Sequence, residues 1–260
     1  MTSTPAATRP RSDLPYDPAF IQLDYRLQTS LDDADAADTL EKWQVTAHLG
    51  EDFGQGQIPP CESCVAEWTA IEEAGGFVDE DAHCPHRLRV GELELVKVRW
   101  DGSQNPFWAM QEDSTNLYEI AEAIFNDDHD GFTPGLEDII EPDDDAMLVL
   151  KSVELADAWR GFGLGPLIAA HALRRLSPGC GVVLVHPSPI DASGMTSQGL
   201  GRARQRLRET WATLGFVSFG DSPYMFYATC WEDPVRQQRA LHEGLNQLSA
   251  QWHKTRPDRR

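Results

Sequence analysis

Residues 159–166 read WRGFGLGP, and the interpretation of the whole chain starts from this stretch. Three glycines fall within five of its residues, so the backbone can turn tightly and its N–H groups are not shielded by Cβ atoms. Periodicity predicts a strand before it, over 146–155, and a helix after it, over 167–176. The unpaired N–H groups and the positive dipole end of that helix face back into the glycine turn. The combination predicts a cradle for a phosphate or diphosphate group.

The segments that come next continue this alternation of strand and helix. Residues 181–186 read GVVLVH, the nearly all-apolar pattern of a strand that is buried on both faces. Helical spacing covers 198–214, and a hairpin is predicted over 216–219 and 225–229. We set a dinucleotide-binding fingerprint aside because the glycine spacing is G-x-G-x-G-P and no acidic residue ends the next strand.

Two motifs in this order carry a resemblance to a known superfamily. Arg160, Gly163 and Gly165 match an Arg/Gln-x-x-Gly-x-Gly/Ala loop, and residues 214–216 (Leu-Gly-Phe) match the end of a Tyr-x-x-Leu-Gly-Phe turn. Residues 146–229, about a third of the chain, therefore resemble the GNAT superfamily of acyl-CoA-dependent N-acyltransferases. The resemblance implies a mixed α/β fold in which a central, splayed β-sheet is flanked by helices.

The N-terminal half supplies further strands that could complete a seven-stranded sheet. Alternating or apolar patterns predict strands over 20–28, 43–49 and 87–100. Helices are predicted over 65–74 and 114–125, with Ser114 and Thr115 as candidate N-caps, and 126–145 is read as an acidic loop. We expect three parts, namely a mobile tail over 1–18, a GNAT-like domain over 19–231 with its coenzyme-binding core at 146–229, and a helical tail over 232–260.

The resemblance implies an N-acyltransferase that moves an acetyl group from acetyl-CoA to an amine by direct attack. The pantetheine arm would lie between the strands 148–155 and 182–186 like an added strand. The residues implied in coenzyme binding are Leu155, Arg160, Gly161, Phe162, Gly163, Leu164 and Gly165. Arg202 and Arg206 share one helix face, which either meets the 3′-phosphate of the coenzyme or is an ordinary solvated face.

Acyl transfer also requires a base for the amine proton and an acid for the thiolate. His186, at the end of the second splayed strand, is the first candidate base, and Glu154 is the second. Trp211 stands where the superfamily commonly has a tyrosine, and an indole N–H cannot protonate a thiolate. Tyr224 is therefore the candidate acid, with Tyr227 or water as substitutes. The alternative is an inactive GNAT-fold module that binds acyl-CoA or a protein partner.

Composition limits the partners and the compartment. A net charge of −20 argues against a nucleic-acid or anionic-membrane surface and suits a cationic acceptor, so we expect a small-molecule or peptide amine. No apolar run reaches the roughly 20 residues that span a bilayer, and the first 18 residues lack the apolar core of a signal peptide. Five cysteines are an odd number, so reduced thiols and a cytoplasmic location are expected. A homodimer is possible, because the superfamily includes monomers and dimers.

Two patterns contain metal-ligand types. Cys61, Cys64, Cys84 and His86, with His83 as a substitute, could hold a structural Zn²⁺, and unlinked reduced cysteines are the alternative. Residues 126–137 nearly fit a Ca²⁺ loop, but the first ligand position is Asn126 and Pro134 interrupts the loop. An ordinary acidic loop is the favoured interpretation there.

Overall fold

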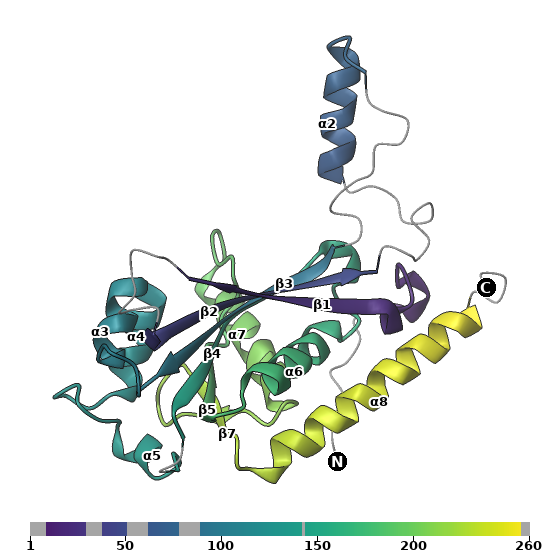
Figure 1. Ribbon diagram of the computed structural model, residues 1–260. Coiled ribbons are helices and arrows are strands. Elements are labelled where there is room, and N and C mark those ends of the chain that lie inside the picture. The colour runs from purple at the N-terminus through teal and green to yellow at the C-terminus, as the bar shows by residue number, and fades with distance from the viewer. Residues whose placement is uncertain (1–8, 30–37, 51–61, 78–88, 142–143, 256–260) are drawn as a thin grey trace.

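The computed structural model describes residues 9–29, 38–50, 62–77, 89–141 and 144–255. Within them, seven strands form one mixed sheet with the order β1-β2-β3-β4-β5-β7-β6 (Figure 1). The strands are β1 (Ile21–Gln28), β2 (Leu40–Leu49), β3 (Arg89–Arg99), β4 (Ala146–Leu155), β5 (Cys180–Val185), β6 (Val217–Ser218) and β7 (Met225–Ala228). Only β4 and β5 pair in parallel, while the other neighbours pair antiparallel. The predicted mixed α/β fold, with a central sheet flanked by helices, is confirmed.

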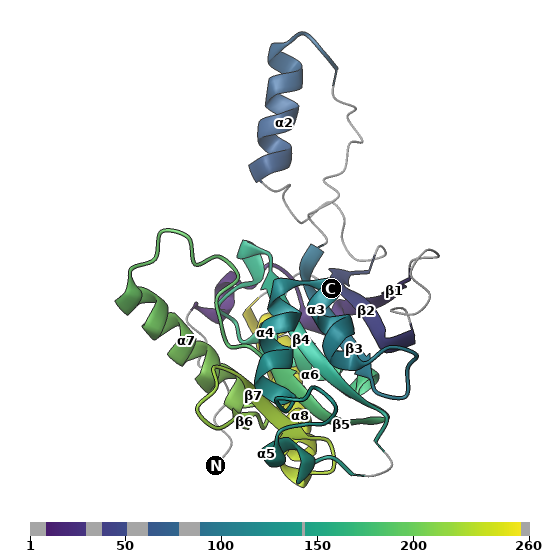
Figure 2. The same ribbon diagram turned by 90° about the vertical axis from the view of Figure 1, so that its left-hand side faces the viewer.

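Helices cover both faces of this sheet. The helices are α2 (Glu62–Glu73), α3 (Pro106–Asp113), α4 (Thr115–Ile124), α5 (Pro134–Glu137), α6 (Leu164–Leu176), α7 (Ser197–Ala212) and α8 (Glu232–Thr255). In Figure 2, α3 and α4 lie in front of the sheet while α6 and α8 lie behind it. Successive residues of β4 and β5 enter opposite clusters, with Leu148 and Val183 facing α6 and Val149 and Leu184 facing α4. This explains why both strands read as continuous apolar runs.

Three helical segments differ from the sequence-based prediction. Helix α6 starts at Leu164 rather than at residue 167, because Gly163 adopts a left-handed conformation and ends the preceding turn. Helix α3 was not predicted, although the Asn105 side chain accepts a hydrogen bond from the N–H of Phe107 and Pro106 occupies the first helical position. The short helix α5 lies inside the predicted acidic loop. The predicted cap Ser114 is confirmed, since its hydroxyl accepts from the N–H of Leu117.

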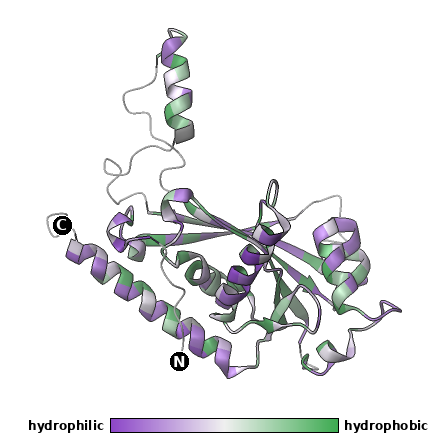
Figure 3. Cartoon of the chain, turned by 180° about the vertical axis from the view of Figure 1, so that it is seen from behind, coloured by the Kyte–Doolittle hydropathy of each residue, from purple (hydrophilic) through white to green (hydrophobic). Residues whose placement is uncertain are grey.

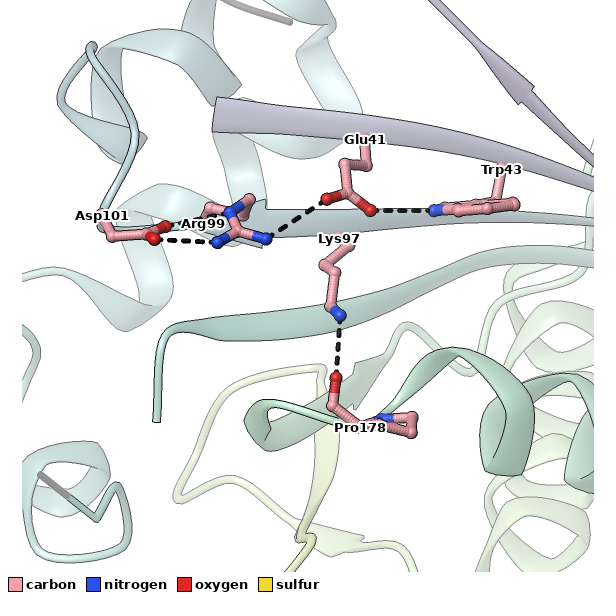
Figure 4. Close-up of polar contacts among 6 residues, drawn as sticks. All are labelled: Glu41, Trp43, Lys97, Arg99, Asp101 and Pro178. Carbon is pink, nitrogen blue, oxygen red and sulfur yellow. Dashed lines mark hydrogen bonds and ion pairs between the residues drawn. The ribbon is translucent and has the colours of Figure 1, made fainter. Parts of the chain in front are cut away.

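Polar contacts hold together the end of the sheet at which β4 and β5 are paired (Figure 4). Arg99 of β3 pairs with Asp101 at 2.8 Å and with Glu41 of β2 at 3.5 Å. Glu41 also accepts from the indole N–H of Trp43 at 3.2 Å. The Lys97 ammonium donates to the carbonyl oxygen of Pro178 at 2.9 Å, which ties β3 to the turn between α6 and β5. These contacts fix the end of the sheet at which β4 and β5 stay paired.

The C-terminal helix α8 runs beside α6 and contacts the residues that precede β1 (Figure 1). The buried carboxylate of Asp17 accepts from the hydroxyl of Ser249 at 3.0 Å and lies 2.7 Å from Nε2 of His253. The rings of Tyr16 and Trp252 lie 5.5 Å apart. Both ends of the described chain are therefore joined on the α6 face of the sheet.

Candidate functional site

Strands β4 and β5 separate halfway along the sheet. Their pairing ends at Leu150 and Val185, whereas β4 continues to Leu155 beside β3. The paired half of β4, from Ala146 to Leu150, is buried, whereas its unpaired half is partly buried with Glu154 exposed. The unpaired half therefore offers one open edge of backbone groups, as the predicted splay requires.

A bulge in β4 marks the point of separation. Leu95 of β3 pairs with Leu150, and the next residue back, Glu94, pairs with Ser152, so Lys151 has no partner in the ladder. Such an extra residue bends its strand and increases the local twist. On the other side β5 ends at Val185, and the chain turns away at His186, whose carbonyl accepts from the N–H of Ser188 at 2.8 Å. The bulge in β4 and the turn after Val185 together make the two strands diverge.

The divergence opens a cleft of about 600 Å³. Its walls come from the unpaired half of β4, the segment after β5 and one face of α7. The lining residues are Leu150 to Leu155, Arg160, Val185, His186, Ser188 to Asp191, Met195, Ala203, Arg206, Leu207 and Trp211. This volume lies within the range of roughly 300–1,000 Å³ that is usual for small-molecule pockets.

The glycine turn follows the end of β4 and leads into α6, directly after Arg160, which lines the cleft. Gly161 and Gly163 have positive φ angles of 85° and 79°, which only glycine adopts without strain. Among the described residues, no hydrogen bond is donated by the N–H groups from Gly161 to Gly165. Pro166 is the third residue of α6, a position where its missing N–H removes no helical bond. Within the described chain, the turn thus presents N–H groups without a partner at the N-terminus of α6.

Gly165 has no conformational reason to be glycine. A Cβ built there would have Leu155 Cδ1 as its nearest neighbour at 3.8 Å, an ordinary contact. At the start of α6, the absent side chain of Gly165 therefore leaves space next to Leu155, which lines the cleft. Two other predicted residues, Phe162 and Leu164, have side chains in the core, so only their backbones are available to a ligand.

Arg160 contacts the last residues of β4. Its Nε donates to the carbonyl oxygen of Leu155 at 2.6 Å, and its guanidinium lies 2.8 Å from Asp157 and 3.5 Å from Glu154. These contacts hold the glycine turn against the strand that it follows. The Arg160 guanidinium therefore pairs with the Glu154 carboxylate, which is exposed and lines the cleft.

The predicted base and acid lie together. The rings of His186, at the end of β5, and Tyr224, just before β7, have centroids 5.0 Å apart. Burial lowers the pKa of His186. The nearby Arg204 and Arg208 lower this pKa further, whereas Glu119 raises it. Its imidazole is therefore neutral at pH 7 and can accept a proton.

Burial and, to a lesser degree, Glu119 raise the pKa of Tyr224 to about 12, so that its phenol stays protonated. Arg208 holds the turn before it by donating to Ser218 Oγ and to the carbonyl oxygen of Pro223, both at 3.1 Å. Tyr224 is itself 3% exposed and does not line the cleft. Its ring contacts that of His186, which does line the cleft.

Helix α7 forms the remaining wall of the cleft. Arg206 lines it, whereas Arg202, one turn away, does not, although the Arg206 Nε donates to the Arg202 carbonyl oxygen at 3.4 Å. Trp211 also lines the cleft and packs on Phe216 at a ring distance of 6.1 Å. The basic residues of α7 form no ion pair with an acidic residue in the described part of the chain.

Sequence reasoning missed several residues of the site. Ile190 and Met195 line the cleft with exposed fractions of 60% and 45%, and Glu119 of α4 acts electrostatically on His186 and Tyr224. No motif marks Ile190 or Met195. The one signal in the sequence is that both are apolar residues in the segment that follows a buried strand. Glu119 is on a separate helix, and the sequence does not reveal that this helix faces the site.

The predicted zinc ligands Cys61, Cys84 and His86, with the substitute His83, lie outside the described residues, whereas Cys64 is buried. Within the described ranges, no group of three or more side chains of histidine, cysteine, aspartate or glutamate is placed to hold a metal ion. Across the same ranges, no helix combines the length and the apolar character needed to cross a bilayer.

Comparisons with known proteins gave matches only among solved structures. No family model matches the chain, and no curated protein matches it. A crystal structure of a KacT mutant matches with 9% identity over 85% of this chain and 98% of the other, at a TM-score of 0.34. AtaT complexed with acetyl-methionyl-tRNAfMet matches with 12% identity over 80% and 95%, at 0.31, and the KacTA–DNA complex with 12% over 87% and 99%, at 0.30. At these scores the likeness supports no inference about substrate or mechanism.

These findings do correct one prediction. The two matched structures that contain tRNA and DNA contradict the expectation of a small-molecule or peptide amine with no nucleic-acid partner. That expectation rested on net charge, which averages over the whole surface. Helix α7 shows the difference locally, since it carries Arg202, Arg204, Arg206 and Arg208 in a chain of net charge −20.

Proposed function

We propose that the chain is an N-acetyltransferase that uses acetyl-CoA as the acyl donor. One observation carries the proposal: the lining of the cleft between the separated strands includes Leu155 and Arg160, and directly after Arg160 comes a glycine turn whose N–H groups have no partner among the described residues. An extended pantetheine arm suits the open edge of β4, because it can pair with backbone groups as a strand does. A diphosphate suits the N-terminus of α6, where N–H groups and the helix dipole favour negative charge.

The chemistry depends on the groups at the other end of the cleft. Acetyl-CoA supplies an activated acyl group, and an amine nitrogen bonds to its carbonyl carbon while the carbon–sulfur bond breaks. We assign His186 as the base that takes the amine proton, because its lowered pKa leaves the imidazole neutral. We assign Tyr224 as the acid for the departing thiolate, because its phenol is protonated and its ring contacts His186.

Other residues would position these groups. Arg160 holds the glycine turn through Leu155, Asp157 and Glu154. Arg206 lines the cleft without an acidic partner in the described chain, which suits the 3′-phosphate of the coenzyme. Glu154 is the weaker base candidate, because its carboxylate already lies 3.5 Å from the Arg160 guanidinium.

A substitution at Gly165 tests coenzyme binding without disturbing the turn. Gly165→Glu should fold normally, because glutamate is favoured in the first turn of a helix and the position has room for a Cβ. It should weaken coenzyme A binding by at least tenfold, measured by isothermal titration calorimetry, because the carboxylate repels the diphosphate. The matched Gly165→Ala variant should lose far less. Equal affinity of the glutamate variant and the unaltered chain would refute the proposal.

A non-catalytic module that binds acyl-CoA is the second candidate, favoured by Trp211 in the cleft wall. Free thiol released from acetyl-CoA in the presence of a panel of amines, including aminoacyl-tRNA, separates the two functions. An enzyme releases thiol, and Tyr224→Phe slows the release while leaving coenzyme A affinity unchanged. A module binds coenzyme A but releases no thiol with any acceptor.

A further inference from the structure

A second pocket lies between α6 and α8, which run side by side in Figure 1. Its volume is about 410 Å³, and it shares no lining residue with the cleft. The residues that line it are Leu167, Ala170, His171, Arg174, Val235, Arg239, Leu241, His242 and Glu243. It is therefore a separate site, and its ligand is independent of the function proposed for the cleft.

Basic side chains dominate the rim of this pocket. His171 and Arg174 come from α6, and Arg239 and His242 come from α8, with the two imidazole rings 5.7 Å apart across the helix pair. In the described parts of the chain, none of the four makes a hydrogen bond or ion pair. Glu243 is the one carboxylate among the lining residues. In a chain of net charge −20, this pocket thus places two guanidinium groups and two imidazoles beside a single carboxylate.

The floor of the pocket is apolar. Leu167, Ala170 and Leu241 are buried between the helices, whereas Val235 is 45% exposed at the pocket edge. Figure 3 shows apolar residues recurring along α8 among hydrophilic ones. An apolar group seated on Val235 would remove its surface from water, which is favourable at roughly 25 cal/mol per Å² of apolar area.

We propose that this pocket binds a small amphipathic carboxylate, a molecule with one carboxylate head and a short apolar body. The guanidinium groups of Arg174 and Arg239 match a carboxylate in charge and in hydrogen-bonding geometry. The floor takes the apolar body, and the volume of about 410 Å³ suits a small ligand. Neither a bare anion nor an uncharged chain uses both parts of the site.

Octanoate is the probe, and two analogues separate its head from its body. Isothermal titration of the full chain should show octanoate binding to one site, with acetate and octanamide at least tenfold weaker. Binding of octanamide as tight as that of octanoate would overturn the carboxylate assignment. Absence of octanoate binding at millimolar concentration would overturn the site itself.

Substitutions locate the binding. The double variant Arg174→Gln, Arg239→Gln should weaken octanoate at least tenfold, and Val235→Asp should do the same while leaving the fold intact, because Val235 is partly exposed. Arg236→Gln is the matched control, since Arg236 lies on α8 but pairs with Glu232 and Asp233 and does not line the pocket. Arg206→Gln, in the cleft, should leave octanoate binding unchanged. Loss of binding in either control would place octanoate elsewhere.

Protonation of His171 makes the affinity depend on pH. Burial lowers the pKa of His171, and Arg174 and His242 lower it further, so its imidazole becomes charged only in mildly acidic solution. The groups that face it are Arg174 on its own helix and Arg239, His242 and Glu243 on α8. Octanoate should bind at least threefold more tightly at pH 5.5 than at pH 8, and His171→Gln with His242→Gln should remove this difference. An unchanged pH dependence in that variant would contradict the role of the pair.

Discussion

At the scale of single residues, the candidate site depends on how burial and charge set the protonation of two side chains. His186 is kept neutral and Tyr224 is kept protonated, although their rings are only 5.0 Å apart. Desolvation is the first cause of both pKa shifts, and it acts in opposite directions because the charged form is a cation in one and an anion in the other. A neutral base beside a protonated acid is the arrangement that acyl transfer to an amine requires.

The pH dependence of turnover tests the role of His186. Activity should rise with pH through an apparent pKa below the ordinary histidine value of about 6.5, because the imidazole must lose its proton before it can accept another. Arg204→Gln removes a charge that lowers this pKa, so the rise should move to higher pH. His186→Gln should lower turnover by roughly 10²–10⁴-fold and abolish the rise.

Arg202→Gln is the control for this experiment, because Arg202 is on the same helix but does not act on His186. Its pH profile should match that of the unaltered chain. If activity rises at the same pH in Arg204→Gln, Arg202→Gln and His186→Gln as in the unaltered chain, the base is a group other than His186.

At the scale of elements, the sequence predicts strongly periodic segments and misses what depends on distant contacts. Strand β4 and the turn at Gly163 were predicted, because a doubly buried strand and a glycine-rich helix start have local signatures. The bulge at Lys151 and the lining by Met195 were not predicted, because both depend on pairing or packing with residues far along the chain. The position of Trp211 in the cleft wall likewise depends on packing between distant elements, so the sequence does not predict it.

Gly91 of β3 shows how a neighbouring element shapes the cleft. A Cβ there would lie 2.5 Å from the carbonyl oxygen of Glu154 and 2.6 Å from Leu155 Cδ2, at the free end of β4. Gly91→Ala should therefore push β4 away, reduce the free energy of unfolding by about 1–3 kcal/mol and weaken coenzyme A binding. Urea unfolding and calorimetry measure both effects.

Gly201→Ala is a suitable control for Gly91→Ala, because Gly201 is within α7 and a Cβ there meets no atom within 4 Å. It should be neutral or slightly stabilising, since alanine is the better helix former. A Gly91→Ala variant as stable as the unaltered chain would show that β3 does not press on the end of β4.

At the scale of the whole molecule, the chain is closed by contacts between residues that are distant in sequence. Asp17 and Ser249 are separated by 232 positions, yet their side chains are hydrogen-bonded on the α6 face of the sheet. The same carboxylate accepts from the N–H of Ala19 at 2.9 Å and lies 2.7 Å from His253. Since α8 packs on α6, which starts at the glycine turn, this junction supports the helix that forms the candidate cradle.

Replacing Asp17 tests that junction. Asp17→Ala removes two part-buried hydrogen bonds, from the Ala19 N–H and from the Ser249 hydroxyl, so the free energy of unfolding should fall by roughly 1–3 kcal/mol. Amide hydrogen exchange should quicken in the last turns of α8 and much less in β4 and β5, because local opening begins where contacts are lost. Asp13→Ala is the control, since Asp13 is exposed and its carboxylate accepts from its neighbour Ser12. Equal stability of the two variants, or faster exchange spread evenly over the sheet, would show that α8 stays in place without Asp17.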